Sequence, residues 1–429
     1  MTSHAIQAVR ITPIAFRDPP LLNAAGIHEP WALRAIVEVE TACGRVGINE
    51  TYGDLPMLEA LAKAAPALQG LSPWALNEME SRVAALVRPP PTASEFLGTQ
   101  VSLAPGTHVS KTVAKVVSAF EVALLDLQGQ LANAPVVDLL GGAARDRVPF
   151  SAYLFYKYAE HIEKPYPPDP WGEALTPPQL VAQARRMIDL YGFQSIKLKA
   201  GALPPDQEAD AILALAEAFP GTPLRIDPNA NWSVATSLRI VERLRGVLEY
   251  YEDPAPGLDG MAAVARACEV PMATNMVVTD FDEFRRNAGM GSPVKIVLSD
   301  HHYWGGLRAT QQLSRLCRTF DLGLSMHSNS HLGISLMAMT HLCASVPLLT
   351  YACDTHYPWQ DEEIVQGGRL RFEQGSLRVP TTPGLGVALD REALARLHDN
   401  YLRCGIRNRN DFAQMRKYDP AFTPEQPRF

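Results

Sequence analysis

The sequence lacks the features that define several whole classes of protein. Its six cysteines are widely scattered and no two form a Cys-x-x-Cys pair, so neither a zinc ribbon nor a disulfide framework is supported. No stretch approaches the ~20 apolar residues that a membrane helix needs, and residues 1–16 lack the apolar run of a secretory signal. We therefore expect reduced thiols, no membrane partner and a cytoplasmic location.

Net positive charge is also absent. The 39 lysines and arginines are outnumbered by 46 acidic residues, so the net charge is −7 and the pI is near 5.9. This balance argues against a nucleic-acid binder but leaves room for a small anionic substrate in a locally positive cleft. Apolar residues make up 47% and charged residues 20%, which excludes collagen-like, coiled-coil and wholly disordered chains.

The first 145 residues predict an α+β unit. Residues 7–50 alternate apolar and polar side chains, as in an antiparallel meander. Residues 55–88 and 112–140 instead have helical spacing, and the second of these runs ends at Gly141-Gly142.

From residue 146 the pattern changes to strand, loop and helix, repeated. Eight candidate strands, from VPFSAYLFY to LLTYACD, predict a TIM-like (β/α)₈ barrel over 146–380, with an irregular final unit as an alternative. The fold class is therefore α/β, a barrel with an α+β capping domain. Residues 381–429 are expected to pack back on the capping domain.

Seven successive strand candidates end in a polar residue, 23 to 28 residues apart. These residues are Lys199, Asp227, Glu252, Asn275, Asp300, His327 and Asp354. In a barrel they would share one level at the carboxyl ends of the strands, where active sites of this fold lie. Strands often end in polar residues because loops begin there, but seven in succession favour an active site.

The oxygen donors among them predict a metal site. Asp227, Glu252 and Asn275 end three consecutive strands, and oxygen donors without Cys or His suit Mg²⁺. The alternative for Asp227 or Glu252 alone is a helix cap or an ion pair with a lysine.

The bases among them predict acid/base chemistry. Lys197 and Lys199 point the same way along one strand, and we expect each to lower the pKa of the other, which favours a general base. The alternative is a surface strand of lysines. His327 follows the strand next to that of Asp300, and a neighbouring carboxylate fixes the tautomer of an imidazole. His301, His302, His331 and His341 are expected to be structural or to support the residues that contact the substrate.

Taken together, these motifs resemble the enolase superfamily, and within it the glucarate dehydratase group, over nearly the whole chain. The segments that carry the resemblance are KLK, DPNANW, EDP, ATNM, LSDHHYW and HSNSHLG, in that order, with FEVALLDLQGQLANAPVVDLLGG before the barrel. LLNAAGIHEPW, AYLFY, DTHYPW and PGLGVALD are also similar to segments of that group.

The resemblance implies a Mg²⁺-dependent dehydratase of acid sugars, of the D-glucarate type. Mg²⁺ would bind at Asp227, Glu252 and Asn275. Lys199 or His327 would remove the proton α to the substrate carboxylate, and Lys197 would stabilise the resulting charge. His327, paired with Asp300, would protonate the leaving β-hydroxyl.

The resemblance also implies a set of substrate-binding residues. They are His28, Thr112, Tyr153, Lys197, Asn229, Asn275, His327, Ser328, Asn329, His356 and Arg409. Arg407 is a rival for Arg409, Thr112 could instead cap its helix, and Tyr153 could fill the barrel. Specificity is expected from the capping-domain loops and from the segment 157–172.

Three alternatives stay open at this point. The substrate could be another aldarate or aldonate. The enzyme could be an acid-sugar epimerase or racemase, because bases on both faces of an enolate could exchange the α-proton. The barrel could also have a non-catalytic binding role. A homo-oligomer is expected by analogy with other barrels of this kind.

Overall fold

The structure is a computed structural model that describes residues 4–87, 111–164, 166–167, 169–423 and 425–429. The first unit is an antiparallel sheet in the order β1-β4-β5, formed by β1 (Ile6–Arg17), β4 (Trp31–Thr41) and β5 (Val46–Tyr52). A small hairpin of β2 (Leu22–Asn23) and β3 (Gly26–Ile27) lies between β1 and β4 in the chain. The predicted meander is present, since β4 pairs antiparallel with β1 on one side and with β5 on the other.

That helical layer contains α1 (Leu55–Ala64), the 3₁₀ turn η1 (Ala65–Leu68), α2 (Leu76–Val87), α3 (Thr112–Ala132) and α4 (Val136–Leu139). Helix α3 contacts β5 on one side and the barrel on the other, so most of its surface is buried. The single helix expected over 112–140 is broken at Asn133, whose left-handed φ of 54° ends α3.

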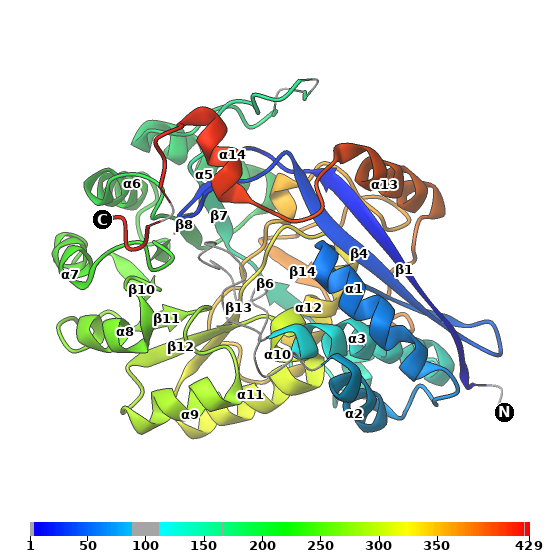
Figure 1. The fold of residues 1–429 in the computed structure, drawn as a ribbon. Coiled ribbons are helices and arrows are strands. Elements are labelled where there is room, and N and C mark those ends of the chain that lie inside the picture. Colours follow the sequence, from blue (N-terminus) through cyan, green and yellow to red (C-terminus); the bar gives the residue numbers. More distant parts are fainter. Residues whose placement is uncertain (1–3, 88–110, 165, 168, 424) are drawn as a thin grey trace.

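Seven parallel strands form the central sheet, in the unbroken order β13-β12-β11-β10-β9-β8-β7. They are β7 (Ala152–Phe155), β8 (Ile196–Lys199), β9 (Leu224–Asp227), β10 (Leu248–Glu252), β11 (Met272–Thr274), β12 (Val294–Ser299) and β13 (Gly323–Met326). Figure 1 shows this sheet curling at the centre of the molecule, with the helices outside it.

The outer helices are α5 (Pro177–Tyr191), α6 (Pro205–Ala218), α7 (Val234–Arg243), α8 (Gly257–Ala265), α9 (Phe281–Gly289), α10 (His301–Trp304), α11 (Leu307–Thr319) and α12 (Gly333–Ser345). Helix α11 shows why they pack: it buries Leu307, Thr310, Leu313 and Cys317, which recur every three or four residues. Helix α12 is buried along its whole length, which places it between the barrel and the capping sheet.

The eighth barrel position is filled by an irregular segment, residues 350–354. Its amides donate to β13, from Thr350 N to Leu324 O at 3.0 Å and from Asp354 N to Met326 O at 2.9 Å. On the other side Cys353 O accepts from Ser151 N at 2.9 Å, just before β7. The barrel is closed, but the final strand is irregular. Cys353 N also donates to Pro149 O at 2.9 Å, at the end of β6 (Arg147–Pro149), the strand that pairs with β14 (Ser376–Arg378).

The chain after the barrel returns to the first unit and then leaves it again. Helix α13 (Arg391–Cys404) packs against β1, and α14 (Asp411–Tyr418) contacts β3. The last residue reaches the loop after β9, where Phe429 N donates to Asn231 O at 3.1 Å. The start of β1 and the C-terminal end lie on opposite sides of the molecule (Figure 1). The domain division at residues 145 and 380 stays a prediction.

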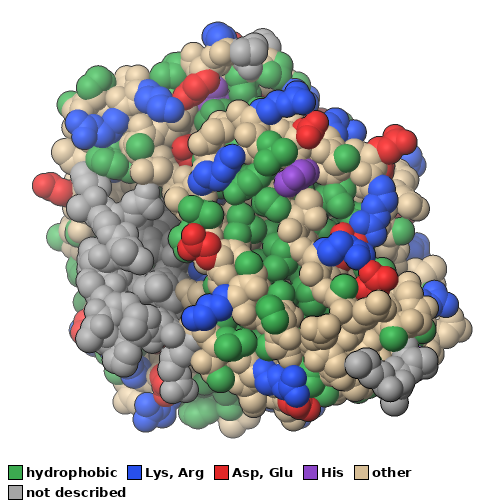
Figure 2. Space-filling model, turned by 45° about the vertical axis from the view of Figure 1, so that its right-hand side comes forward, with side chains coloured by type: hydrophobic (Ala, Val, Ile, Leu, Met, Phe, Trp, Pro, Cys, Tyr) green, Lys and Arg blue, Asp and Glu red, His purple; other side chains and the backbone are tan. Residues whose placement is uncertain are grey.

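The surface of the capping side carries both signs of charge among apolar side chains, and Figure 2 shows no continuous basic patch on this face. Within the described ranges, no helix has the length and apolarity needed to cross a membrane. All six cysteines are free thiols.

Candidate active site

The strand-ending residues meet at one end of the barrel. Strands β8 and β9 are in register with Lys199 opposite Asp227, and Glu252 ends the next strand. Asn275, Asp300 and His327 are each the first residue after β11, β12 and β13. None of the six is more than 7% exposed. The prediction that they share a level holds because parallel strands in register end at the same edge of the sheet.

The acidic groups form a compact cluster with unsatisfied oxygens. Carboxylate oxygens of Asp227, Glu252 and Asp253 lie within 4.8 Å of one another. Glu252 Oε1 and both amide atoms of Asn275 are buried without a hydrogen-bond partner in the described part of the chain. Burial and the nearby Asp227 raise the pKa of Glu252 well above its ordinary value. Buried polar groups without partners are rare, and a cation-binding role accounts for the unpartnered oxygens of Glu252 and Asn275.

Asp253 is the residue of this cluster that the sequence reasoning did not single out. Its carboxylate accepts from Thr274 Oγ1 at 2.5 Å and from Asn275 N at 3.0 Å. Asp253 therefore holds the backbone on which Asn275 sits, while the side-chain oxygen of Asn275 stays available. Asp227, Glu252 and Asn275 thus offer oxygen donors only, and this donor set fits Mg²⁺.

The two lysines of β8 differ in their surroundings. Lys197 Nζ is fully buried and lies 2.5 Å from Glu252 Oε2 and 2.6 Å from Asp354 Oδ2. Lys199 Nζ lies 2.7 Å from Asp227 Oδ2. Both side chains are inside the barrel, so the surface-strand alternative is excluded.

The expected lowering of both lysine pKa values is wrong for Lys197. Burial by itself lowers the pKa of this ammonium, but the carboxylates of Asp354 and Glu252 outweigh it and raise the pKa well above its ordinary value. The expectation was wrong because it did not include Asp354 as a partner of Lys197. Lys197 is therefore a charged donor in this structure.

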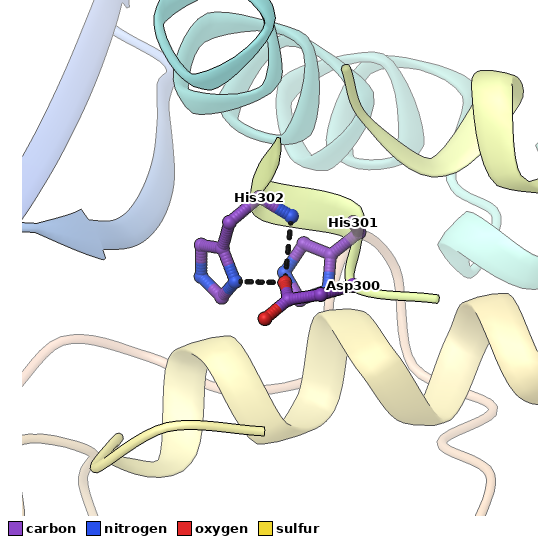
Figure 3. A group of neighbouring side chains, drawn as sticks. All are labelled: Asp300, His301 and His302. Atoms are coloured by element: carbon purple, nitrogen blue, oxygen red, sulfur yellow. Dashed lines mark hydrogen bonds and ion pairs between the residues drawn. The ribbon is translucent and has the colours of Figure 1, made fainter. Parts of the chain in front are cut away.

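Asp300 is shared by two histidines. Its Oδ2 lies 3.2 Å from His327 Nδ1, and its Oδ1 lies 2.7 Å from His302 Nδ1 and accepts from His302 N at 2.9 Å. Figure 3 shows both contacts of His302 converging on this carboxylate. Burial raises the pKa of Asp300, but the two histidines outweigh it and hold that pKa well below its ordinary value.

A second group of possible metal donors consists of Asp300, His301 and His302 (Figure 3). It is a poor cation site because the Arg34 guanidinium already lies 2.9 Å from His302 Nε2. A metal there would sit beside a buried positive charge and would compete with the His302–Asp300 contact.

Several residues expected to bind substrate contact one another near this cluster. The rings of His28 and His356 stack at 6.3 Å, and Tyr153 lies 5.0 Å from the His356 ring. Ser328 Oγ lies 3.0 Å from His356 Nδ1, and Tyr153 donates to Asp227 Oδ2 at 3.4 Å. Tyr153 therefore lies at the cluster, where both barrel filling and substrate contact stay possible.

Two asparagines of the expected set are held by other side chains. Asn329 Nδ2 donates to Tyr52 Oη at 3.0 Å, and Tyr52 reaches Asp300 Oδ2 at 3.5 Å. Asn229 directs its amide to Met276 Sδ at 3.2 Å. Tyr52, on β5, is a neighbour of the His327–Asp300 pair that the sequence reasoning missed.

The choice between Arg407 and Arg409 is clearer in three dimensions. Arg407 donates to the carbonyls of Tyr401 and Ile406, in its own helix–loop turn. Arg409 forms a two-pronged ion pair with Asp411, at 2.7 and 2.6 Å. Asp411 also accepts from Asn23, near the His28 loop. Arg409 is thus the one on the His28 side, but its guanidinium already has a carboxylate partner.

Thr112 is the first residue of α3, and the cap position is Lys111, which makes no side-chain cap bond. Capping of α3 stays an alternative for Thr112. Lys111 itself pairs with Asp280 at 2.5 Å.

Asp18 is a further residue that no sequence motif indicated. Its carboxylate lies 3.0 Å from His28 Nδ1, accepts from Ser330 Oγ at 3.0 Å and accepts from Gln360 Nε2 at 3.2 Å. Its backbone carbonyl accepts from Tyr166 Oη at 2.7 Å, in the segment expected to set specificity. One buried side chain thus ties together three loops around the mouth of the barrel.

Comparisons with known proteins identify the family of this chain. Residues 179–393 match the family model described as "Enolase C-terminal domain-like". The whole chain is 51% identical, over 99% of both chains, to a probable glucarate dehydratase of Streptomyces coelicolor. The chain belongs to the enolase superfamily.

Solved structures show the same relationship for this superfamily member. An enolase of Pseudomonas fluorescens with bound magnesium, potassium and tartrate is 58% identical, with a TM-score of 0.96 and full coverage of both chains. An enolase of Thermobispora bispora complexed with magnesium and formate is 54% identical, also over both full chains, with a TM-score of 0.94. The prediction of a TIM-like barrel with an α+β capping domain is confirmed.

Proposed function

We propose that this enolase-superfamily member is a Mg²⁺-dependent hydro-lyase of acid sugars, with D-glucarate as the first candidate substrate. One observation carries the proposal: buried oxygens of Glu252 and Asn275 lack partners beside Lys197, Lys199 and the His327–Asp300 pair. The 51% identity to a probable glucarate dehydratase supports this substrate class. A D-xylonate dehydratase of Haloferax volcanii, 26% identical over 85% of this chain and 84% of its own, supports the reaction type.

Asp227, Glu252 and Asn275 would hold Mg²⁺, which when bound supplies Lewis-acid stabilisation for negative charge on the substrate carboxylate. The α-proton of a carboxylate is weakly acidic, so charge stabilisation is the main requirement of the reaction. Lys197 is suited to help because Glu252 and Asp354 keep it charged and fixed in place.

Lys199 and His327 would move the protons. They come from the second and seventh positions of the barrel, and so approach the substrate from different sides. One of them removes the α-proton, the bond from the β-carbon to its hydroxyl breaks, and His327 protonates the departing hydroxyl to give water. The remaining enol then tautomerises to a 2-keto-3-deoxy acid. Because His327 Nδ1 faces Asp300, its Nε2 is the nitrogen that exchanges the proton.

The outer residues would set specificity. We propose that the substrate hydroxyls are contacted by His28, Tyr153, Ser328 and His356. Contacts among these four side chains support the proposal. Thr112, Asn229, Asn329 and Arg409 complete the proposed set, with Arg409 exchanging Asp411 for the distal carboxylate. We also propose that the protein is a cytoplasmic homo-oligomer.

The deciding test is a screen of mono- and diacid sugars for 2-keto product, with and without Mg²⁺. Lys199→Ala and His327→Ala should abolish product formation. Lys295→Ala is the matched control, because Lys295 lies on β12 with its side chain exposed outside the barrel. Turnover that survives in both variants would refute the roles of Lys199 and His327.

Two bases on different strands also favour an epimerase or racemase as the second candidate. In D₂O a dehydratase gives 2-keto product, whereas an epimerase gives α-deuterated acid with an inverted centre. Deuterium exchange with inversion and without keto product would replace the first proposal by the second.

A further inference from the structure

A buried polar chain connects the capping sheet to His327. Arg34, on β4, donates from Nε to Glu50 Oε1 of β5 at 3.1 Å, and its Nη2 lies 2.9 Å from His302 Nε2. His302 contacts Asp300, which in turn contacts His327. Each of these five side chains belongs to a residue that is at most 4% exposed. The chain therefore runs through protein, where hydrogen-bond polarity is enforced.

The two neighbours of His302 in this hydrogen-bonded series, Arg34 and Asp300, determine its tautomer. A guanidinium has five donors and no acceptor, so His302 Nε2 must accept from Arg34 and carry no proton. The carboxylate of Asp300 accepts, so His302 Nδ1 must carry the proton and donate. The geometry thus defines a neutral His302 with its proton on Nδ1.

The rival state is a His302 imidazolium, and it has one contact in its favour. The backbone carbonyl of Glu50 lies 3.3 Å from His302 Nε2, and Ser335 Oγ also lies 3.3 Å away. A proton on Nε2 could serve that carbonyl, but it would place two cations 2.9 Å apart in a buried site. The rings of Tyr52 at 5.2 Å and His301 at 4.0 Å add no further charge next to His302.

Arg34 is held in this position by Glu50. Its partner Glu50 accepts from Leu332 N at 2.8 Å and from Ser335 N at 3.1 Å, at the start of α12. The same carboxylate thus caps a barrel helix and fixes the arginine of the capping sheet. The contact between the capping sheet and α12 therefore sets the direction of the hydrogen bonds that run from Arg34 through His302 to Asp300.

We propose that Arg34 and His302 are positioning residues for the acid/base histidine. Arg34 fixes the tautomer of His302, and His302 holds the carboxylate of Asp300 by two hydrogen bonds so that Oδ2 faces His327 Nδ1. The role of His327 rests on the proposed function, whereas the tautomer of His302 does not depend on it.

The tautomer is tested directly by ¹⁵N NMR of the full-length protein labelled with ¹⁵N-histidine. The His302 signals are assigned by their loss in His302→Asn. We expect one protonated and one unprotonated ring nitrogen for His302, with Nδ1 protonated, between pH 6 and 8. Two protonated nitrogens, or a proton on Nε2, would overturn the proposal whatever the protein's substrate proves to be.

Kinetics test the positioning role through two substitutions at one site. In His302→Asn the amide nitrogen replaces Nδ1 and can still donate to Asp300, whereas His302→Leu fills the space without a donor. We expect kcat to fall about tenfold or more in His302→Leu, with KM changed less, and at least a partial return in His302→Asn. His301→Leu is the neighbouring control and should leave kcat unchanged. Equal kcat losses in the Asn and Leu variants would refute the donor role.

The contribution of Arg34 is tested in the double variant Arg34→Met with Glu50→Gln. The single glutamine oxygen can still accept from Leu332 N or from Ser335 N, so this variant keeps one of the two contacts at the start of α12 while removing both charges. We expect His302 to lose its single tautomer and the pH profile of kcat to shift, with the melting temperature measured alongside. An unchanged tautomer and an unchanged profile would show that Arg34 plays no such part. If the parent protein turns over no acid sugar, the proposed function fails while the NMR result still stands.

Discussion

Asp18 offers the sharpest test of how the loops around the mouth are held. In Asp18→Asn the charge is lost, and one oxygen that faces His28 and Ser330 becomes a donor or is turned away. The remaining oxygen can still accept from Gln360. A hydrogen bond to a charged group is worth about 1.5–3 kcal/mol. Two such bonds, partly compensated by rearrangement, suggest about 3 kcal/mol of lost stability.

The functional effect should separate from the stability effect. Asp18 fixes His28 and Ser330. Among the described residues, no hydrogen bond or ion pair joins Asp18 to Lys197, His327 or Asp300. We therefore expect KM for the acid sugar to rise about tenfold or more, with a smaller change in kcat. The assay is steady-state kinetics of 2-keto product formation, at a temperature well below the melting point of the variant.

Asp18 also predicts a direction of pH dependence. Burial raises the pKa of this carboxyl, but His28, Arg409 and Gln360 together outweigh it, and the pKa is lowered below its ordinary 3.8. A lowered pKa gives stability that is present above the unfolded value and is lost as the pH falls through the folded value. The parent should thus lose more stability than Asp18→Asn on going from pH 5 to pH 3.

Asp361→Asn is the matched control, since Asp361 is exposed and follows Gln360 directly. It should leave KM, kcat and melting temperature unchanged. If Asp18→Asn lowers the melting temperature but leaves KM at the parent value, Asp18 stabilises the fold without positioning a substrate residue, and the reasoning above is wrong.

Three further predictions concern the metal, a buried acid and one close contact. Asn275→Ala should weaken Mg²⁺ binding about tenfold or more in calorimetry, because it removes one of three proposed oxygen donors; unchanged affinity would exclude Asn275 as a ligand. Burial raises the pKa of Glu208 to about 8, so its folded state holds a proton that the unfolded state releases. Stability should fall as the pH rises from 5 to 8, and less so in Glu208→Gln; equal slopes of melting temperature against pH would contradict this. Gly47→Ala should lower the melting temperature sharply, because its Cβ would overlap the Ala123 carbonyl and meet Leu127 Cβ at 2.7 Å. Gly289→Ala, whose Cβ has nothing within 4 Å, is the control, and equal melting temperatures would refute the contact.

The sequence predicted well what depends on regular spacing. Each βα unit of the barrel returns the chain to the same edge of the sheet, so a polar residue at the end of each strand predicts one shared site. Lys199 opposite Asp227 is the clearest instance, since register alone brings them together. Periodicity also predicted the capping meander and the helix that begins at Thr112.

The sequence predicted poorly what depends on several distant groups at once. The pKa of Lys197 rises because Glu252 and Asp354 both reach it, and Asp354 lies 157 residues away. Arg409 was expected to be available to substrate, but it pairs with Asp411, whose carboxylate also accepts from Asn23, 388 residues away.

The sequence by itself thus determined the superfamily, the barrel and the chemical groups at its mouth, because identity and period are local properties of the chain. Only the tertiary structure decided how those groups are held. Arg34 and His302 are 268 residues apart, and Asp18 and Gln360 are 342 apart. Contacts of this kind follow from the docking of the capping sheet and the closing of loops, and no spacing along the chain encodes them.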